Sequence, residues 1–239
     1  MRPCFSRLIG IVLIMLLALE ISAQEERMSV CSHGSTIGPK QLIVDAFNKA
    51  KGEKTYVLDL TYLNEASEID SRTVFEIALP NYRMMAIGSE GFRYEVIKIG
   101  DDVYSSPVSP VLGGERSAKP NWEKSKSDLE LDVADMLTVW VKSSHLMTNV
   151  EFIGQVRLEN KLACLVQYDF HPSVVSSKEL VPISTTGPDS KVTIWISERG
   201  LPLQIEYKGR LKYSNEKGKI LKRVERFEFR EVIIRAPKI

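Results

Sequence analysis

Residues 73–106, TVFEIALPNYRMMAIGSEGFRYEVIKIGDDVYSS, determine the expected fold, because short apolar segments follow one another with few residues between them. The intervening residues, Pro80-Asn81, Gly88 to Gly91 and Gly100-Asp101, are of the types that form tight turns. Parallel strands need a crossover connection of about a dozen residues or more. Strands this close together therefore pair antiparallel, and the stretch predicts a meander of hairpins.

Strands are also predicted on both sides of this meander. Before it, apolar and polar residues alternate from Tyr56 to Tyr62, which is the pattern of a half-buried strand. After it, segments of strand character are bounded by turn residues and cover residues 150–158, 162–170, 192–197, 201–213 and 219–234. Most of the chain is thus expected to form strands.

Two segments have helical rather than alternating periodicity. The first follows Pro39 and ends near Gly52, and its apolar stripe consists of Leu42, Ile43, Ala46, Phe47 and Ala50. The second begins at Ser127, and Glu130 three residues later completes a capping box. Its apolar face consists of Leu129, Val133, Met136, Leu137, Trp140 and Val141.

These elements predict an α+β fold, in which one large antiparallel sheet has both helices packed over one face. A sheet of about ten strands twists and tends to curl, so the covered face is expected to be concave. Its interior is either filled by its own side chains or hollow, and the pattern of residues is compatible with both.

The N-terminus has the order of features of a secretory signal peptide. Arg2 and Arg7 precede the apolar run Leu8 to Leu19, and the small residues Ser22 and Ala23 follow. The run of twelve residues is shorter than the ~20 that a membrane-spanning helix needs. We expect residues 1–23 to be removed after Ala23, and residues 24–239 to form a single domain in the periplasm.

Two cysteines, Cys31 and Cys164, remain in the expected mature chain. An exported protein reaches a compartment that permits disulfides, so these two residues are a candidate pair. Cys164 lies within the apolar segment 162–166 and is equally compatible with a small buried side chain.

Five segments resemble, in order, the outer-membrane lipoprotein-sorting superfamily, which includes LolA/LolB-like and LppX/LprG-like proteins. The segments are residues 82–85 (YRMM), 91–104 (GFRYEVIKIGDDVY), 150–154 (VEFIG), 162–166 (LACLV) and 191–203 (KVTIWISERGLPL). The resemblance extends over roughly residues 40–235 and consists of alternating strands rather than a catalytic signature. It implies a half-open β-barrel that holds the acyl chains of a lipid or lipoprotein under a helical lid.

This resemblance makes apolar residues of the sheet and of the second helix candidates for the wall and lid of a lipid cavity. The same residue types at strand or helix spacing are typical of an ordinary core, so both interpretations stay open. The candidates are Leu58, Leu60, Met84, Tyr94, Val96, Val133, Met136, Leu137, Trp140, Phe152, Leu165, Ile194 and Ile205.

The residues that catalysis or metal binding requires are few. The histidines are His33, His145 and His171, and Cys31 with His33 provides half of the four ligands of a structural zinc site. We assign no catalytic residue, no metal and no cofactor. The expected function is that of a non-catalytic carrier, and the alternative is an envelope interaction or sensor module with a filled core.

Charge is distributed unevenly along the chain. Residues 208–239 contain 11 Lys or Arg and 4 Glu, a net charge of +7. This segment is a candidate for transient contact with an anionic membrane surface or an envelope protein, or else forms the solvated face of an outer strand. Nucleic acid is not an expected partner, because aromatic residues that stack on bases are scarce there.

Overall fold

The structure, a computed structural model, describes residue 31 and residues 37–88, 93–108, 122–125, 133–170, 191–211 and 219–237. The expected signal peptide, and the part of the second helix before residue 133, lie outside these ranges. So do His33 and His171.

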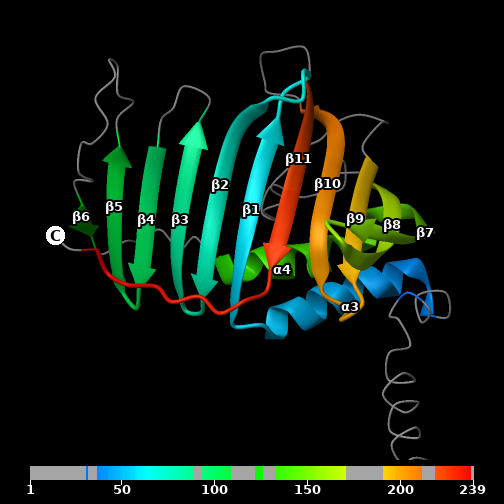
Figure 1. The fold of residues 1–239 in the computed structure, drawn as a ribbon, viewed down its shortest axis with the longest axis horizontal. Coiled ribbons are helices and arrows are strands. Elements are labelled where there is room, and N and C mark those ends of the chain that lie inside the picture. Colours follow the sequence, from blue (N-terminus) through cyan, green and yellow to red (C-terminus); the bar gives the residue numbers. More distant parts are fainter. Residues whose placement is uncertain are drawn as a thin grey trace, which may run out of the picture.

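The described residues form one antiparallel sheet of 11 strands with two α-helices and a short 3-10 helix, η1 (Figure 1). The helices are α3 (Pro39–Gly52), α4 (Val133–Lys142) and η1 (Ser143–Leu146). The strands are β1 (Thr55–Leu63), β2 (Ile69–Ala78), β3 (Asn81–Gly88), β4 (Arg93–Ile99), β5 (Asp102–Val108), β6 (Glu123–Ser125), β7 (Met147–Leu158), β8 (Lys161–Phe170), β9 (Lys191–Ser197), β10 (Pro202–Leu211) and β11 (Lys219–Glu228).

The sheet consists of two meanders that meet at its centre. The strand order is β6-β5-β4-β3-β2-β1-β11-β10-β9-β8-β7, and each neighbouring pair is antiparallel. The two edge strands, β6 and β7, do not pair with each other, so the sheet remains open. The predicted α+β fold with an antiparallel half-barrel is therefore confirmed.

Both helices lie over the concave face of the sheet (Figure 1). All five residues of the stripe predicted for the first helix are buried in α3. Phe47 of α3 stacks on Trp140 of α4, with ring centroids 5.5 Å apart. In the last turn of α3, the ammonium group of Lys49 donates a hydrogen bond to the carbonyl of Arg199 in the β9–β10 turn.

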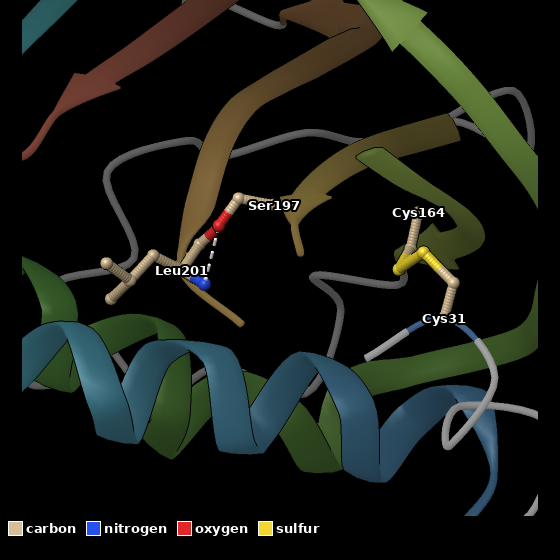
Figure 2. The surroundings of a disulfide bond; sticks show 4 residues. All are labelled: Cys31, Cys164, Ser197 and Leu201. Carbon is tan, nitrogen blue, oxygen red and sulfur yellow. Dashed lines mark hydrogen bonds between the residues drawn. A yellow bond between two sulfur atoms is a disulfide. The ribbon is translucent and has the colours of Figure 1, made fainter. Parts of the chain in front are cut away.

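A disulfide joins Cys31 to Cys164 of β8 and so attaches the segment before α3 to the sheet (Figure 2). Both cysteines are buried, at 4% and 0% exposure. The adjacent β9–β10 turn is closed by Ser197, whose hydroxyl accepts from the Leu201 amide at 3.1 Å and donates to the Leu201 carbonyl at 3.0 Å. The N-terminal end of the helical layer is thus covalently fixed to the sheet.

The last strand is shorter than predicted. Residues 219–234 were expected to continue as one strand, but β11 ends at Glu228 and residues 229–237 leave the sheet. Glu228 pairs with Val57, close to the start of β1 at Thr55. The residues before Thr55 belong to the connection from α3. Among the residues that the structure describes, no strand pairs with the extension, which runs along the ends of the neighbouring strands (Figure 1).

Candidate functional site

The register of the sheet assigns alternate residues to two faces. Tyr56, Leu58, Leu60 and Tyr62 of β1 point to the face that the helices cover, because Tyr56 and Leu58 belong to the same buried cluster as the stripe of α3. Val57, Asp59 and Thr61 point to the opposite face. Directly paired residues on neighbouring strands share a face, which extends this assignment across the sheet.

The part of the covered face formed by β8 to β10 is filled by the protein's own side chains. Val166, Ile194 and Ile205 form one cross-strand row, with Ile194 paired to both of the others. Their exposures are 0%, 0% and 1%, and they pack in the same cluster as Leu42 and Phe47 of α3. Of the residues predicted to line a cavity, Ile194 and Ile205 thus lie in the packed core.

The helices cover the part of this face that is formed by β1, β3 and β4 less completely. Leu60, Met84 and Tyr94 face the helices but remain partly exposed, and they pack along the margin of the buried cluster. Leu58 and Val96 on the same face are 2% and 7% exposed. The covered face therefore changes, from the β8–β10 side to the β3–β4 side, from a filled core to a partly exposed apolar surface.

The predicted lid residues of α4 are only partly described. Leu137 is 3% exposed and belongs to the buried cluster, and Trp140 is partly exposed and stacks on Phe47. The side chains of Val133 and Met136 lie outside the described part of the structure. Leu137 and Trp140 are thus the described lid candidates, and both contact the buried cluster.

Two further candidates lie on the β7–β8 hairpin. Phe152 pairs with Val166 and packs, partly buried, against the core. Leu165 pairs with Trp195 and alternates with the buried Cys164 and Val166, so its side chain lies on the opposite face of the sheet. The structure therefore brings Phe152, but not Leu165, to the covered face.

A buried ion pair lies on the covered face, at positions that were not predicted to be functional. Arg223 and Glu225 of β11 pair directly with Tyr62 and Leu60 of β1. The Arg223 guanidinium donates to the Glu225 carboxylate, and the two side chains are only 5% and 4% exposed. Burial lowers the pKa of Arg223, while the neighbouring Tyr62 favours the charged form.

The number of charged residues in β11 explains why sequence patterning missed this pair. Six of its ten residues, KILKRVERFE, are charged, which is typical of a solvated strand, and an outer strand was one interpretation of this segment. That interpretation is wrong, because β11 lies between β1 and β10 at the centre of the sheet. The aromatic neighbours of Arg223, Tyr62 and Tyr207, lie on the adjacent strands and are far from it in the sequence. The sequence alone therefore does not show that Arg223 lies beside them.

Other basic residues of the same segment have acidic or polar partners. Lys222 forms an ion pair with Glu206 at 2.7 Å, and Arg230 forms one with Glu228 at 3.1 Å. Arg226 donates to the Gln204 side chain at 3.1 Å. Contact of this segment with an anionic membrane or an envelope protein stays a prediction.

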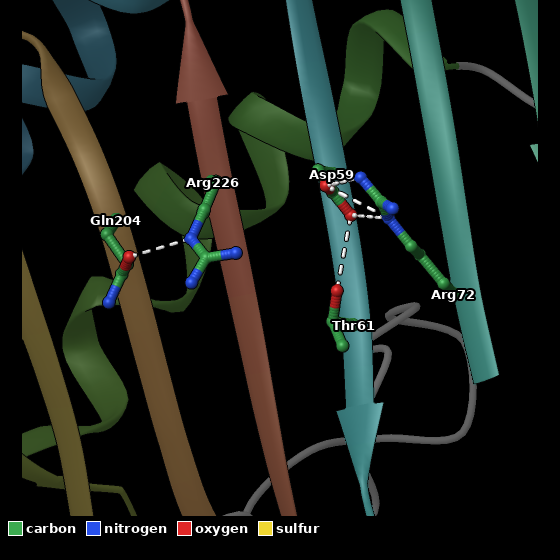
Figure 3. Close-up of polar contacts among 5 residues, drawn as sticks. All are labelled: Asp59, Thr61, Arg72, Gln204 and Arg226. Carbon is green, nitrogen blue, oxygen red and sulfur yellow. Dashed lines mark hydrogen bonds and ion pairs between the residues drawn. The ribbon is translucent and has the colours of Figure 1, made fainter. Parts of the chain in front are cut away.

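The opposite face of the sheet contains a polar groove of about 420 Å³. Asp59 and Arg72 form a bidentate ion pair in it, and Thr61 donates to Asp59 at 3.2 Å (Figure 3). The tip of the β7–β8 hairpin, at Leu158 and Glu159, contributes to its wall. None of the residues predicted for a lipid cavity lines this groove.

In the described ranges, no group of three His, Cys, Asp or Glu side chains is placed to hold a metal ion. His145 lies in η1, where its Nδ1 is 2.7 Å from the Lys142 carbonyl oxygen.

Among the residues that the structure describes, no helix has the length and apolar character that crossing a membrane requires.

No protein-family model matches this chain, and no curated protein matches its sequence. Solved structures nevertheless share its fold. The lipoprotein LppX of Mycobacterium tuberculosis superposes with a TM-score of 0.50 at 11% identity, over 82% of this chain and 97% of LppX. LprF from Mycobacterium bovis superposes with a TM-score of 0.52 at 11% identity, over 83% of this chain and 96% of LprF. The resemblance predicted from the sequence is therefore confirmed at the level of the fold.

Proposed function

We propose that this protein is an exported, non-catalytic carrier that shields the acyl chain of a lipid or lipoprotein on the helix-covered face of its sheet. Residues 1–23 act as a cleaved signal peptide, and residues 24–239 work in the periplasm as one domain. The observation that supports this proposal most directly is the partly exposed apolar surface at Leu60, Met84 and Tyr94.

The binding surface in this proposal is narrower than the set of residues predicted from the sequence. Ile194 and Ile205 serve the core, because α3 already covers them. The acyl chain lies instead along β1, β3 and β4, with Trp140 of α4 beside the core at its margin. In this proposal the packed part at β8 to β10 is a rigid wall, and the partly exposed part at β1, β3 and β4 is the surface on which the acyl chain lies.

Burial of hydrocarbon is sufficient to drive such binding. Each methylene removed from water contributes about 0.8 kcal/mol, so a palmitoyl chain gains about 12 kcal/mol before the costs of association and ordering are subtracted. Neither a metal nor a covalent step is needed. The shared fold of the mycobacterial lipoprotein LppX supports a half-barrel of suitable shape.

The experiment is native mass spectrometry of the mature chain purified from an envelope fraction of expressing cells. We expect a population with additional mass that organic extraction releases as lipid. The extracted protein is then titrated with a palmitoylated peptide. A clean apo mass, together with no uptake during the titration, would contradict the proposal.

An interaction module is the second candidate function, and the polar groove on the opposite face favours it. Asp59, Arg72, Gln204 and Arg226 present charges and hydrogen-bonding groups there, beside the tip of the β7–β8 hairpin. If this groove is the functional site, Arg226→Ala weakens capture of an envelope protein by the mature chain and leaves uptake of the palmitoylated peptide unchanged.

A further inference from the structure

The polar groove on the opposite face of the sheet has a floor and a wall from different parts of the chain. Its floor is a cross-strand row in which Asp59 of β1 and Gln204 of β10 pair with Arg226 of β11 from either side. Its wall is the tip of the β7–β8 hairpin, where Glu159 and Asn160 have positive φ values of 48° and 66°. Two such residues in sequence form a tight hairpin turn, so the groove has a wall that a flat sheet face lacks.

Arg226 is held in this groove by one side of its guanidinium group. Its Nε donates to the Oε1 of Gln204 at 3.1 Å, and Gln204 is buried, at 5% exposure, and donates to Glu206 at 3.0 Å. The carboxylate of Asp59 directs both of its oxygens at Arg72 (Figure 3). Among the described residues, no carboxylate lies within ion-pair distance of Arg226. Its two Nη groups are therefore oriented and available to a ligand.

The charges that line the groove balance, except for that of Arg226. Each acidic residue of the groove has a basic residue as its ion-pair partner or as a near neighbour in the chain. These combinations are Asp59 with Arg72, Glu228 with Arg230, and Glu159 with Lys161. One positive charge is left over, so the groove suits a ligand with a single negative charge.

A carboxylate fits this surplus charge better than a phosphate does. The Nη groups of an arginine form a planar fork that matches the two oxygens of a carboxylate. A phosphate dianion would bring a second negative charge close to Asp59, the cross-strand neighbour of Arg226, and like charges at this distance repel each other. An ion pair on an open surface contributes little, because water competes for both groups, whereas the wall of the groove limits that competition.

Apolar side chains line the same groove and indicate what the carboxylate is attached to. Val57 and Val74 belong to the floor, and Leu158 belongs to the wall. A ligand that fills this space has an apolar group close to its carboxylate. The last residue of a peptide has this arrangement, because its α-carbon bears both the carboxylate and the side chain. Internal Asp and Glu residues do not, because their carboxylate ends an unbranched side chain.

A peptide also suits the polar part of the groove better than a fatty acid does. Backbone N–H groups of a peptide can donate to the carboxylates at Glu159 and Glu228, which line the groove. A hydrocarbon chain would displace water from these carboxylates without replacing the hydrogen bonds, which is costly. The groove volume of about 420 Å³ lies within the range of small-ligand sites, roughly 300–1,000 Å³.

We propose that this groove binds the free C-terminus of a protein that ends in an apolar residue. Arg226 holds the terminal carboxylate, and Val57, Val74 and Leu158 contact the last side chain. This inference rests on the second candidate function, the interaction module, and specifies what that module recognises. The acyl-chain surface lies on the other face of the sheet, so the carrier function is independent of it.

The experiment is an NMR titration of the nitrogen-15-labelled mature chain with two peptides, acetyl-Gly-Gly-Leu as the free acid and as the C-terminal amide. Trp195 reports on the groove, because it pairs with Gln204 and shares its face, and Trp140 of α4 reports on the covered face. Trp195→Phe assigns the indole signal of Trp195. We expect the free acid to shift this signal and to bind about tenfold more tightly than the amide, as hydrogen bonds to a charged group predict.

Arg226→Gln is the informative variant, because it removes the charge of an exposed side chain. We expect it to bind the acid and the amide equally. Arg226→Lys keeps the charge but lacks the fork, and it should retain only a small part of the preference for the acid. Arg93→Gln is the matched control, since Arg93 is also exposed on the opposite face but lies outside the groove. This control keeps the full preference, and urea midpoints check that all variants are folded.

Three further probes test the class of ligand. Acetyl-Gly-Gly-Asp-amide presents its carboxylate on a side chain, octanoate presents it on a plain hydrocarbon, and inorganic phosphate has no apolar group. We expect each of them to bind at least several-fold more weakly than the free acid of acetyl-Gly-Gly-Leu. If any of them binds as tightly, recognition of a C-terminus is wrong.

The outcomes separate this inference from both candidate functions. Equal binding of acid and amide, no binding of either, or an unchanged preference in Arg226→Gln overturns the inference. If Arg226→Ala still weakens capture of an envelope protein, the interaction module stands without it. Methyl palmitate, which has no carboxylate, tests the carrier function in the same samples: it should shift the Trp140 signal, equally in Arg226→Gln. Failure of methyl palmitate to bind contradicts the carrier function alone.

Discussion

Phe47 of α3 and Trp140 of α4 stack with ring centroids 5.5 Å apart and ring planes only 10° from parallel. Phe47 is fully buried, whereas Trp140 is partly exposed at the margin of the cluster. Phe47 also meets the ring of Phe227 at 6.5 Å in an edge-on arrangement. The Phe47 ring therefore connects both helices to β11, next to the central strand of the sheet.

Trp140→Ala separates a lid from an ordinary core. Because Trp140 is only partly buried, we expect the free energy of unfolding in urea to fall by about 1–2 kcal/mol, including the lost stacking. Uptake of methyl palmitate should fall clearly. Phe47→Ala is the comparison, and it should lower the free energy of unfolding by about 3–5 kcal/mol. If Trp140→Ala lowers the free energy of unfolding as much as Phe47→Ala does and ligand binding is retained, Trp140 belongs to the core.

Met84 and Met85 provide a matched test of the two faces. Met84 lies on the covered face between Phe75 and Val96, and Met85 lies on the opposite face between Val74 and Glu95. We expect Met84→Lys to weaken methyl palmitate binding at least tenfold, because the ammonium disrupts the apolar surface, and Met85→Lys to leave it unchanged. Each variant should lose about 1 kcal/mol of stability. Equal effects of both substitutions on binding would exclude the covered face as the site.

The disulfide between Cys31 and Cys164 should contribute substantially to stability. It closes a loop with a sequence separation of 133 residues, and cross-links over loops of this length contribute about 4–5 kcal/mol through the unfolded state. We expect replacement of both cysteines by Ala to lower the free energy of unfolding by a few kcal/mol. Reducing agent should destabilise the parent chain and leave the double variant unchanged. Identical urea midpoints for the two proteins would show that the bond contributes little.

The buried pair of Arg223 and Glu225 should show strong coupling between its two members. Arg223→Met alone leaves a carboxylate buried without its counter-charge, which costs about 3–5 kcal/mol, whereas replacing both residues with apolar ones is often close to neutral. We therefore expect Arg223→Met with Glu225→Leu to be more stable than Arg223→Met alone. Urea unfolding of the four proteins of this cycle gives the coupling energy. Additive losses would show that the ion pair is not coupled in solution.

The expected signal peptide makes a prediction of its own. Expression of the full chain in a bacterium should produce a mature protein that begins at Gln24, because small residues precede the cut after Ala23. N-terminal sequencing or intact mass identifies the new terminus. Retention of residues 1–23 in the envelope fraction would contradict cleavage.

Local sequence patterns predicted most elements because those elements form locally. The apolar stripe from Leu42 to Ala50 coincides with the buried side of α3, and the turn residues of 80–101 separate β2 to β5 as predicted. β6, three residues long, has no pattern to detect. The extension after Glu228 alternates like a strand but has no strand to pair with.

The site was less predictable, because it depends on which strands become neighbours. Alternation gives each residue a face, but only the pairing of β1 with β11 shows that Arg223 faces inward beside Tyr62. The same pairing distinguishes Ile205, in the packed half, from Leu60, at the exposed margin. Which strands become neighbours depends on how the whole chain folds, and the periodicity of apolar residues within one strand does not reveal it.

The pairing of β1 with β11 also affects how the protein is made. A ribosome produces β1 to β5 early and β7 to β10 late, so each meander can form while its inner edge is still unpaired. Within the sheet, the two halves are joined by the pairing of β11, the last strand, with β1. Such open edges are prone to aggregation until they are paired. A truncation before Lys219 would therefore leave two half-sheets with unpaired inner edges rather than a smaller version of the domain.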